Sequence, residues 1–253
     1  MIPTHTDAYD TLSFLHPRCI YLYKKVGYTP LQVIKYITPH LSTDEASACT
    51  YVGRLDPMAE GWMHVLWSGD ANEKKELASQ DKLYEIDVVC GVGTDTGDAL
   101  GMITDFKRVE IKNLEEIVQS FVGPFTFPYP KFSSPHIKNT LKGEEVVEKL
   151  QQGDISKIEL VRVEEIENLQ YQIGVKLSHC HMDGDFRLEK IQKEWDHFFQ
   201  KESVEGFTNI KLRVYCGSGT YMRTLAEEIG KKLETPAFAL HIKRIGVGKL
   251  IHN

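Results

Sequence analysis

Apolar side chains at every second position mark two segments of this chain as strands with one buried face. In residues 83–92, Tyr84 and the apolar residues after it alternate with Glu85 and Asp87, and residues 210–216 repeat the pattern with basic and tyrosine partners. Successive side chains of a strand point to opposite faces of a sheet, so a period of two indicates a half-buried strand. We therefore predict strands over both segments and expect Tyr84 on the buried face.

Shorter apolar runs predict three further strands. The run 19–23 is expected to be the first strand of the chain, 63–67 a later one and 239–245 the last. Such runs, bounded by polar or turn-forming residues, are typical of strands that are buried on one or both faces.

Helices are predicted where apolar side chains recur three or four residues apart. A short helix is expected to begin near Pro30, since proline suits the first helical position, with Leu31, Ile34 and Ile37 on its apolar side. Residues 71–79 are predicted to form a polar helix.

Three more helices follow later in the chain. Asn113 and Glu116 have the spacing of a capping box ahead of an apolar stripe that ends at Phe121. Further helices are expected to begin near Asp185 and at Tyr221. The apolar side of the helix near Asp185 comprises Leu188, Ile191, Trp195 and Phe198.

Together these elements favour an α+β fold, in which a mixed, mostly antiparallel sheet is flanked by helices. Strands and helices alternate without a regular βαβ rhythm, which argues against a parallel sheet. The sequence contains no internal repeat, no low-complexity segment and no long linker. We therefore expect residues 1–253 to form a single domain.

The composition is that of an ordinary globular protein, with 42% apolar and 26% charged residues among 253. No apolar run reaches the length needed to cross a membrane, and the first ten residues lack the pattern of a signal peptide. We expect a cytoplasmic location by default. The five cysteines are scattered without a CxxC pair, which favours buried apolar residues over a disulfide framework or a zinc ribbon.

The formal net charge of -6 argues mildly against a nucleic-acid partner, because neutralising phosphates draws on a basic surface. A net charge is an average, however, and basic side chains can still line a local cleft. The candidates for such a cleft are Lys24, Lys25, Arg54, Lys74, Lys75, Lys131, Lys138, Lys142, Arg223, Lys243 and Arg244.

Candidate chemistry begins with a glycine-flanked segment, residues 53–61 (GRLDPMAEG), which places Asp56 between a leucine and a proline. Taken alone, an aspartate before proline is an ordinary turn residue. Three later segments change that interpretation because they occur in a fixed order after it. They are residues 82–84 (KLY), 93–101 (GTDTGDALG) and 219–225 (GTYMRTL).

In this order, the four segments resemble the TruB family of tRNA pseudouridine synthases. The resemblance extends from about residue 19 to residue 250, but residues 142–205 fit poorly and are interpreted as a divergent insertion. It implies the pseudouridine synthase catalytic fold and the isomerisation of a uridine in the T-loop of tRNA, of the uridine-55 type. It also implies no metal and no cofactor. Because the chain ends soon after the last predicted strand, we expect no C-terminal PUA-like RNA-binding domain.

The resemblance further implies roles for individual residues. Asp56 matches the catalytic carboxylate beside the ribose, either as a nucleophile or as a base that forms a glycal, two routes that the sequence leaves open. Tyr84 matches the ring that stacks on the flipped uracil, with its hydroxyl near the proton lost at the end. Leu240 matches an aliphatic residue that lines the uracil pocket. Lys24, with Gly27, matches the lysine and glycine of the first strand and is expected to contact the substrate.

Arg223 carries a physical argument of its own. It lies in the first turn of a predicted helix, where the helix dipole disfavours a cation by some tenths of a kcal/mol. A compensating carboxylate is therefore expected. We predict that Arg223 pairs with Asp56 at roughly 2.7 to 3.2 Å, which would also favour the ionised form of Asp56.

One departure concerns the side chain that fills the gap left by the flipped base. The family often has a histidine where this chain has Tyr51, so Tyr51 and Arg54 are the two candidates, and we favour Tyr51. An arginine directly before the leucine, as in Arg54, is reminiscent of synthases that act on ribosomal RNA. An enzyme for ribosomal or other RNA is therefore the alternative within the class.

Other acidic and potentially metal-ligating patterns are interpreted as structural. Asp95 and Asp98, in a glycine-rich turn, are expected to cap local backbone donors rather than to hold a metal. His179 and His181 flank Cys180, but alternate residues of a strand point to opposite faces and no further ligand cluster follows, so no metal site is predicted. The alternative of another class is a non-catalytic RNA-binding or RNA-folding protein on the same scaffold.

Overall fold

The structure is a computed structural model of the chain, and it describes residues 6–16, 18–130, 132 and 150–248. Among these residues, a nine-stranded sheet has the order β1-β2-β4-β11-β5-β10-β9-β8, with β3 paired to β4. Strands β4 and β11 run parallel, and the other paired strands of this sheet run antiparallel. The predicted α+β fold with a mixed, mostly antiparallel sheet is therefore confirmed.

The strands of this sheet are β1 (Tyr9–His16), β2 (Cys19–Lys24), β3 (Thr50–Val52), β4 (Ala59–Leu66), β5 (Lys82–Cys90), β8 (Gly123–Pro128), β9 (Leu150–Ile166), β10 (Phe207–Cys216) and β11 (Ala237–Val247). A separate ribbon pairs β6 (Val92–Thr94) with β7 (Ile103–Phe106). The helices are α1 (Pro30–Ile37), α2 (Thr43–Ala48), α3 (Ala71–Ser79), α4 (Leu114–Gln119), α6 (Leu169–Ser178), α7 (Leu188–Lys201) and α8 (Met222–Lys232), and a 3-10 turn follows α1 at Thr38–His40.

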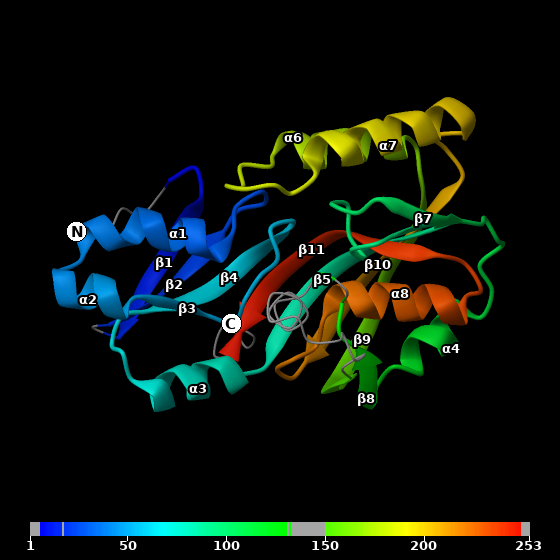
Figure 1. The fold of residues 1–253 in the computed structure, drawn as a ribbon. Helices are drawn as coiled ribbons and strands as arrows, with labels where there is room; N and C mark the ends of the chain where they lie inside the picture. The colour runs from blue at the N-terminus through cyan, green and yellow to red at the C-terminus, as the bar shows by residue number, and fades with distance from the viewer. Residues whose placement is uncertain (1–5, 17, 131, 133–149, 249–253) are drawn as a thin grey trace.

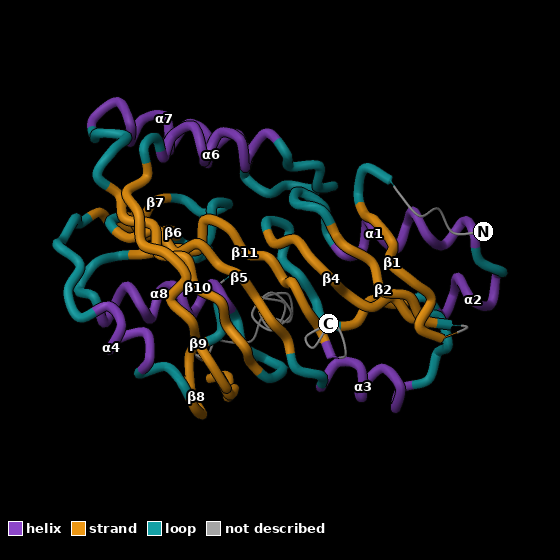
Figure 2. The backbone as a smooth tube through the Cα atoms, turned by 180° about the vertical axis from the view of Figure 1, so that it is seen from behind, coloured by secondary structure: helices purple, strands orange, loops and turns teal. Residues whose placement is uncertain are grey.

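Helices cover the sheet unevenly. In Figure 1, α8 and α4 lie in front of the strands at one end, α1 and α2 lie beside β1 and β2 at the other, and α6 and α7 run along one edge. Seen from behind, the strands lie in front of α8 and α4 (Figure 2). Much of the rear face of the central strands is thus left without a helix over it, which fits the alternating polar residues of β5.

The two faces of the central strands belong to different apolar clusters. Val88 of β5 packs with Leu225 of α8 in the main cluster, whereas its neighbour Val89 packs with Trp195 of α7 in a second cluster. This division is what a side-chain period of two requires. Tyr84 lies in the main cluster with 7% of its surface exposed, so its predicted place on the buried face is confirmed.

Several predicted elements agree closely with the structure. The polar helix at residues 71–79 is α3, and the helix expected near Pro30 is α1. The helix expected at Tyr221 begins one residue later as α8, and the one expected near Asp185 begins at Leu188 as α7. These helices have Pro, Asp or strong apolar periodicity at their starts, which are local signals.

Three details of the predicted secondary structure were wrong. Strand β1 precedes the run 19–23, and register shifts in its pairing with β2 interrupt the alternation that would have revealed it. Asn113 makes no capping hydrogen bond, because it adopts a left-handed conformation with φ 52°. Leu31 is 58% exposed, and Val33 takes the buried position in its place. A spacing of three residues alone does not decide which side of a short helix faces the core.

The segment interpreted from the sequence as a divergent insertion, residues 142–205, is described from residue 150 onward. It supplies β9, which pairs with both β8 and β10, and then helices α6 and α7. No helix in the described part of the chain combines the length and the apolar character needed to cross a membrane.

The parallel pairing of β4 with β11 depends on a close backbone contact at Gly61. A Cβ atom at this position would lie 2.2 Å from the carbonyl oxygen of Arg244 in β11, and the φ of Gly61 is +127°. A side chain would therefore meet both a clash and a strained conformation. This pairing brings the loop before β4 next to the last strand, so it contributes directly to the position of Asp56.

We predict that Gly61→Ala lowers the free energy of unfolding by more than about 2 kcal/mol, measured by urea denaturation. The matched control is Gly174→Ala, in the middle of α6, where a built Cβ meets nothing within 4 Å. That change should stabilise the protein by roughly 0.5 to 1 kcal/mol through helix propensity. Equal stability of the two variants would show that the backbone contact at Gly61 is unimportant.

Candidate active site

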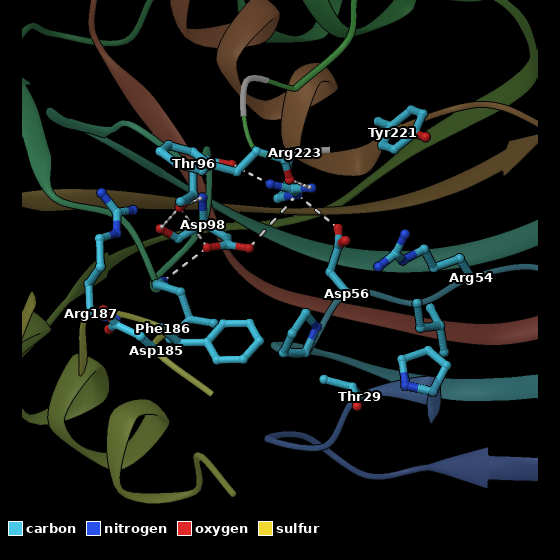
Figure 3. Close-up of a pocket in the computed structure, with 15 residues that line it drawn as sticks. Thr29, Arg54, Asp56, Thr96, Asp98, Asp185, Phe186, Arg187, Tyr221 and Arg223 are labelled. Atoms are coloured by element: carbon cyan, nitrogen blue, oxygen red, sulfur yellow. Dashed lines mark hydrogen bonds and ion pairs between the residues drawn. The ribbon is translucent and has the colours of Figure 1, made fainter. Parts of the chain in front are cut away.

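The turn that carries Asp56 is anchored by apolar side chains around it. Leu55 is buried in the main cluster and Met58 in the second one, and the Ala59 N–H group donates to the Asp56 carbonyl oxygen at 3.0 Å. The carboxylate of Asp56 points toward Arg223 and lines a cavity (Figure 3). With 27% of its side chain exposed, it is held in place yet open to a ligand.

Arg223 and Asp56 form the predicted ion pair. The Arg223 Nε group donates to Asp56 Oδ2 at 2.8 Å, and the arginine side chain is only 4% exposed. Arg223 lies in the first turn of α8, where no acidic residue and no side-chain cap are present. The carboxylate across the cavity thus compensates a cation that the helix start disfavours, which confirms the expected contact.

Asp98 is a second carboxylate at the same arginine, and the sequence analysis did not assign it to the site. Its Oδ2 atom lies 3.8 Å from Arg223 Nε, and its side chain is 5% exposed. The other oxygen, Oδ1, accepts from the Leu100 N–H at 2.9 Å and from the Thr96 hydroxyl at 2.8 Å. The predicted capping of backbone donors is therefore confirmed for Asp98, but the residue also faces Arg223.

The environment of Arg223 fixes its charge. Burial acts to lower the pKa of the guanidinium, but the carboxylates of Asp56 and Asp98 outweigh it and raise that pKa. Burial raises the pKa of the Asp98 carboxyl group, against the opposing effect of Arg223. A further hydrogen bond joins Arg223 Nη1 to the Thr96 carbonyl oxygen at 2.8 Å. The arginine is thus a fixed cation between two carboxylates and a backbone carbonyl group.

Two cavities adjoin Asp56. One, of about 400 Å³, reaches Arg223, Asp98 and Phe186. The other, of about 330 Å³, reaches Tyr84. Asp56 and Arg54 line both. Both volumes are in the range of small-ligand sites, so a ligand in either cavity would contact the carboxylate.

Tyr84 presents a buried phenol to the second cavity. Its hydroxyl accepts a hydrogen bond from Arg244 Nη1 at 3.4 Å. Burial raises the pKa of Tyr84, with Arg244 acting in the opposite direction, so the side chain stays a neutral phenol at neutral pH. An apolar ring beside a carboxylate is suited to stacking against a planar base.

Leu240 does not reach either cavity next to Asp56. A β-bulge interrupts the pairing of β11 with β5 between Ala239 and His241, and Leu240 packs with Phe238 in the second cluster. The aliphatic residue of β11 that lines the cavity of Tyr84 is Ile242. Ile242, and not Leu240, is thus the aliphatic residue of β11 beside Tyr84, because of a bulge that sequence alternation does not reveal.

Lys24 is buried and lines neither cavity next to Asp56, so its expected contact with the substrate stays a prediction. Its side chain is 0% exposed, and Nζ donates to the carbonyl oxygens of Tyr28 at 2.8 Å, Lys25 at 3.0 Å and Pro57 at 3.4 Å. Burial lowers its pKa to about 7, although the charges of Asp56 and Glu60 act to raise it. Lys24 ties β2 to Pro57, the residue that follows Asp56.

The two candidates for the side chain that replaces the base are placed differently. Tyr51 lies in β3 opposite Val65 of β4 and packs partly buried against the main cluster, and it lines neither cavity. Arg54 is exposed and lines both cavities. The structure thus brings Arg54, and not Tyr51, to the carboxylate.

The other basic candidates are dispersed. Arg244 is 1% exposed, and it donates to the carbonyl oxygens of Gly53 at 2.6 Å and Trp62 at 2.5 Å, so it supports the loop. Lys74 and Lys75 are exposed on α3. Lys131, Lys138 and Lys142 lie outside the described residues. No group of three or more His, Cys, Asp or Glu side chains in residues that the structure describes is arranged to hold a metal ion.

Comparison with solved structures shows which fold this is. The chain resembles one in the crystal structure of a Cbf5-Nop10-Gar1 complex, with a TM-score of 0.54 and 17% identity over 91% of this chain and 49% of that one. A second match is a chain in a structure of an H/ACA RNP bound to a substrate RNA containing 2'-deoxyuridine, with a TM-score of 0.53 and 16% identity, covering 91% of this chain and 47% of that one. At these identities the likeness shows the fold alone.

The sequence comparisons identify the family. The family model described as TruB family pseudouridylate synthase (N terminal domain) matches residues 43–182, more than half of the chain, so the protein belongs to this family. It is 27% identical over 204 residues to the tRNA pseudouridine synthase B of Blochmanniella pennsylvanica, covering 79% of this chain and 64% of that protein. It is 26% identical over 231 residues to that of Bacillus pumilus, covering 90% and 64% respectively. The chain thus spans less than two thirds of the length of these curated relatives.

We predict that Lys24→Met lowers the free energy of unfolding by about 1 to 3 kcal/mol without a direct effect on RNA binding. The change keeps the apolar stem but removes the Lys24 donor from the carbonyl oxygens of Tyr28 and Lys25. Thermal melting and titration with tRNA measure the two effects. Lys75→Met, on exposed α3, is the control and should leave stability unchanged. Weaker RNA binding at unchanged stability would instead make Lys24 a contact residue.

Proposed function

We propose that this chain converts a uridine in the T-loop of tRNA to pseudouridine and that Asp56 is its catalytic carboxylate. The observation that carries the proposal is the pairing of a partly exposed Asp56 with the buried Arg223, at the boundary of two cavities. Membership of the TruB family supports the reaction, and the names of the relatives support tRNA as the substrate. We further propose a cytoplasmic location, where such a substrate is found.

The reaction breaks the bond between ribose C1′ and uracil N1 and forms a bond between C1′ and uracil C5, after which C5 loses a proton and N1 gains one. A carboxylate is needed beside the ribose, either to attack C1′ or to remove a proton from the sugar. Asp56 is suited to both routes. Arg223 fixes the oxygen Oδ2 at 2.8 Å and leaves Oδ1 for the substrate.

The base is proposed to lie in the cavity that Tyr84 lines. Its ring and Ile242 offer apolar contacts for a uracil that must leave the stack of the RNA, which costs a few kcal/mol. Burial raises the pKa of Tyr84, so its phenol is neutral before the reaction. Stacking against the uracil is the role that we assign to the Tyr84 ring.

Asp98 is proposed as a positioning residue for this reaction. It contacts Arg223 from the side opposite Asp56, and its own orientation is fixed by Thr96 and Leu100. Removing it would leave a buried arginine with one carboxylate partner. The orientation of Asp56 would then be less well defined.

We predict that Asp56→Asn abolishes pseudouridine formation while tRNA affinity stays within about threefold, because the change removes a charge but little volume. Pseudouridine mapping in tRNA and a binding titration measure the two effects. Asp44→Asn, an exposed change in α2, is the control and should behave as wild type. Residual activity within tenfold of wild type would exclude Asp56 as the catalytic group. A wild-type protein that binds tRNA but forms no product would instead favour the non-catalytic alternative.

Arg54 is proposed to occupy the space that the flipped uridine leaves, in place of Tyr51. An exposed planar cation beside both cavities can stack on bases and meet phosphate, whereas Tyr51 packs against the sheet. A vacant stack would forfeit roughly 1 to 3 kcal/mol per base. The likeness of Arg54 to an arginine of ribosomal-RNA synthases keeps ribosomal RNA as the alternative substrate, to be tested beside tRNA.

We predict that Arg54→Ala slows turnover on intact tRNA at least tenfold more than on a short RNA whose target uridine is already unpaired and unstacked. The filling side chain matters only when the base must be displaced from a stack. Tyr51→Ala should show no such difference between the two substrates. The reverse result, with Tyr51→Ala sensitive to RNA structure, would restore Tyr51 to this role.

A further inference from the structure

The connection between α6 and α7 reaches the cavity on the Arg223 side of Asp56. Asp185, Phe186 and Arg187 line that cavity together with Asp56 and Arg223. These three residues lie beyond residue 182, where the match to the family model ends. This part of the cavity wall is therefore supplied by a portion of the chain to which no role has been assigned above.

One side of this connection is fixed to the turn that holds Asp98. Arg187 donates to both carboxylate oxygens of Asp95, from Nη1 at 2.8 Å and from Nη2 at 3.2 Å. The two side chains are 30% and 14% exposed, so the pair is partly shielded from water. The guanidinium also lies 4.6 Å from the centre of the Phe132 ring. Both terminal nitrogens of Arg187 are engaged by Asp95, so this arginine positions the wall.

The other side of the connection is fixed to the start of α1. The His181 N–H donates to the Gly27 carbonyl oxygen at 3.0 Å, and Gln32 Nε2 donates to the His181 carbonyl oxygen at 2.5 Å. Lys35 and Asp183 form an exposed ion pair at 2.8 Å. The connection therefore joins two separate walls of the cavity, and Phe186 lies between these two attachments.

Phe186 presents its ring to the cavity. In Figure 3 the ring projects from the connection into the space that Asp56 and Arg223 border, on the side of the cavity opposite Arg54. The Tyr84 ring lines the other cavity. Asp56 therefore lines two cavities, and each contains an aromatic side chain, Phe186 in one and Tyr84 in the other.

We propose that Phe186 is a stacking platform for the nucleotide next to the target uridine and that Arg187, through Asp95, is the positioning residue that holds it there. This inference rests on the proposed function. In this arrangement the target uracil lies against Tyr84 and its ribose lies at Asp56. The adjoining nucleotide is one phosphodiester link away and enters the cavity that Phe186 lines. An aromatic ring recognises the face of any base, so this contact adds affinity with little sequence selectivity.

The first test separates stacking from simple filling of space. Phe186→Leu retains an apolar side chain of similar reach but no aromatic face, whereas Phe186→Tyr retains the face. We expect Phe186→Leu to raise the KM for tRNA about tenfold at nearly unchanged kcat, and Phe186→Tyr to stay within about twofold of wild type. Thermal melting verifies that all variants are folded. A leucine variant with wild-type KM would overturn the proposal.

The second test observes the stacked base directly. Two tRNA substrates carry 2-aminopurine, one at the 5′ neighbour of the target and one at the 3′ neighbour. We expect binding of the wild-type protein to quench the fluorescence of one of them more strongly than binding of Phe186→Leu does. Equal quenching by the two proteins with both RNAs would show that Phe186 stacks on neither neighbour.

The third test concerns the ion pair of Arg187 with Asp95. Arg187→Gln should raise KM, as Phe186→Leu does. The double variant should be no worse than the more severe single variant, because both changes remove the same contact between the Phe186 ring and the base. Lys35→Gln breaks the exposed pair with Asp183 on the same connection and should leave KM unchanged. Additive losses in the double variant, or an equal loss in Lys35→Gln, would overturn the positioning role of Arg187.

If the wild-type protein forms no pseudouridine in any RNA, the proposed function fails. If it is active but the variants match it, only the inference about Phe186 and Arg187 fails.

Discussion

The rest of the site depends on the ion pair that a buried arginine makes with two carboxylates. Arg223 is 4% exposed at a helix start, where neither water nor the helix dipole favours its charge. A charge buried in this way is tolerated only with close partners, and removing one partner costs roughly 3 to 5 kcal/mol. Asp56 and Asp98 are those partners. The orientation of Asp56 is therefore a requirement of folding as well as of the proposed chemistry.

The fold class and the ion pair could be predicted because their signals are local. Alternation marks β5 and β10, and the position of Arg223 in a helix start indicates by itself that an acid must be near. The motifs then named Asp56 as that acid. Tyr84 was placed correctly for the same reason, since its face of the strand follows from its neighbours alone.

The differences at the site come from features that need the tertiary structure. A β-bulge places Ile242, and not Leu240, beside Tyr84, and burial makes Lys24 a support for the Asp56 loop. Asp98 was interpreted only as a cap, although it also faces Arg223. Phe186 and Arg187 gave no local signal, because their place in the cavity is decided by how α6 and α7 dock. Sequence patterns report neighbours along the chain, whereas these four cases depend on neighbours across it.

The parallel pairing of β4 with β11 also governs when the site can exist. Asp56 and Arg223 are 167 positions apart, and β11, which lies between β4 and β5, is the last described strand to leave the ribosome. A nascent chain that lacks β11 has β4 and β5 without the strand that pairs with both of them. Contacts of such long sequence separation form slowly because their loop entropy is lost before they are made. During synthesis, therefore, Asp56 is made well before Arg223, and the strand pairing that supports their contact can form only once β11 has also been translated.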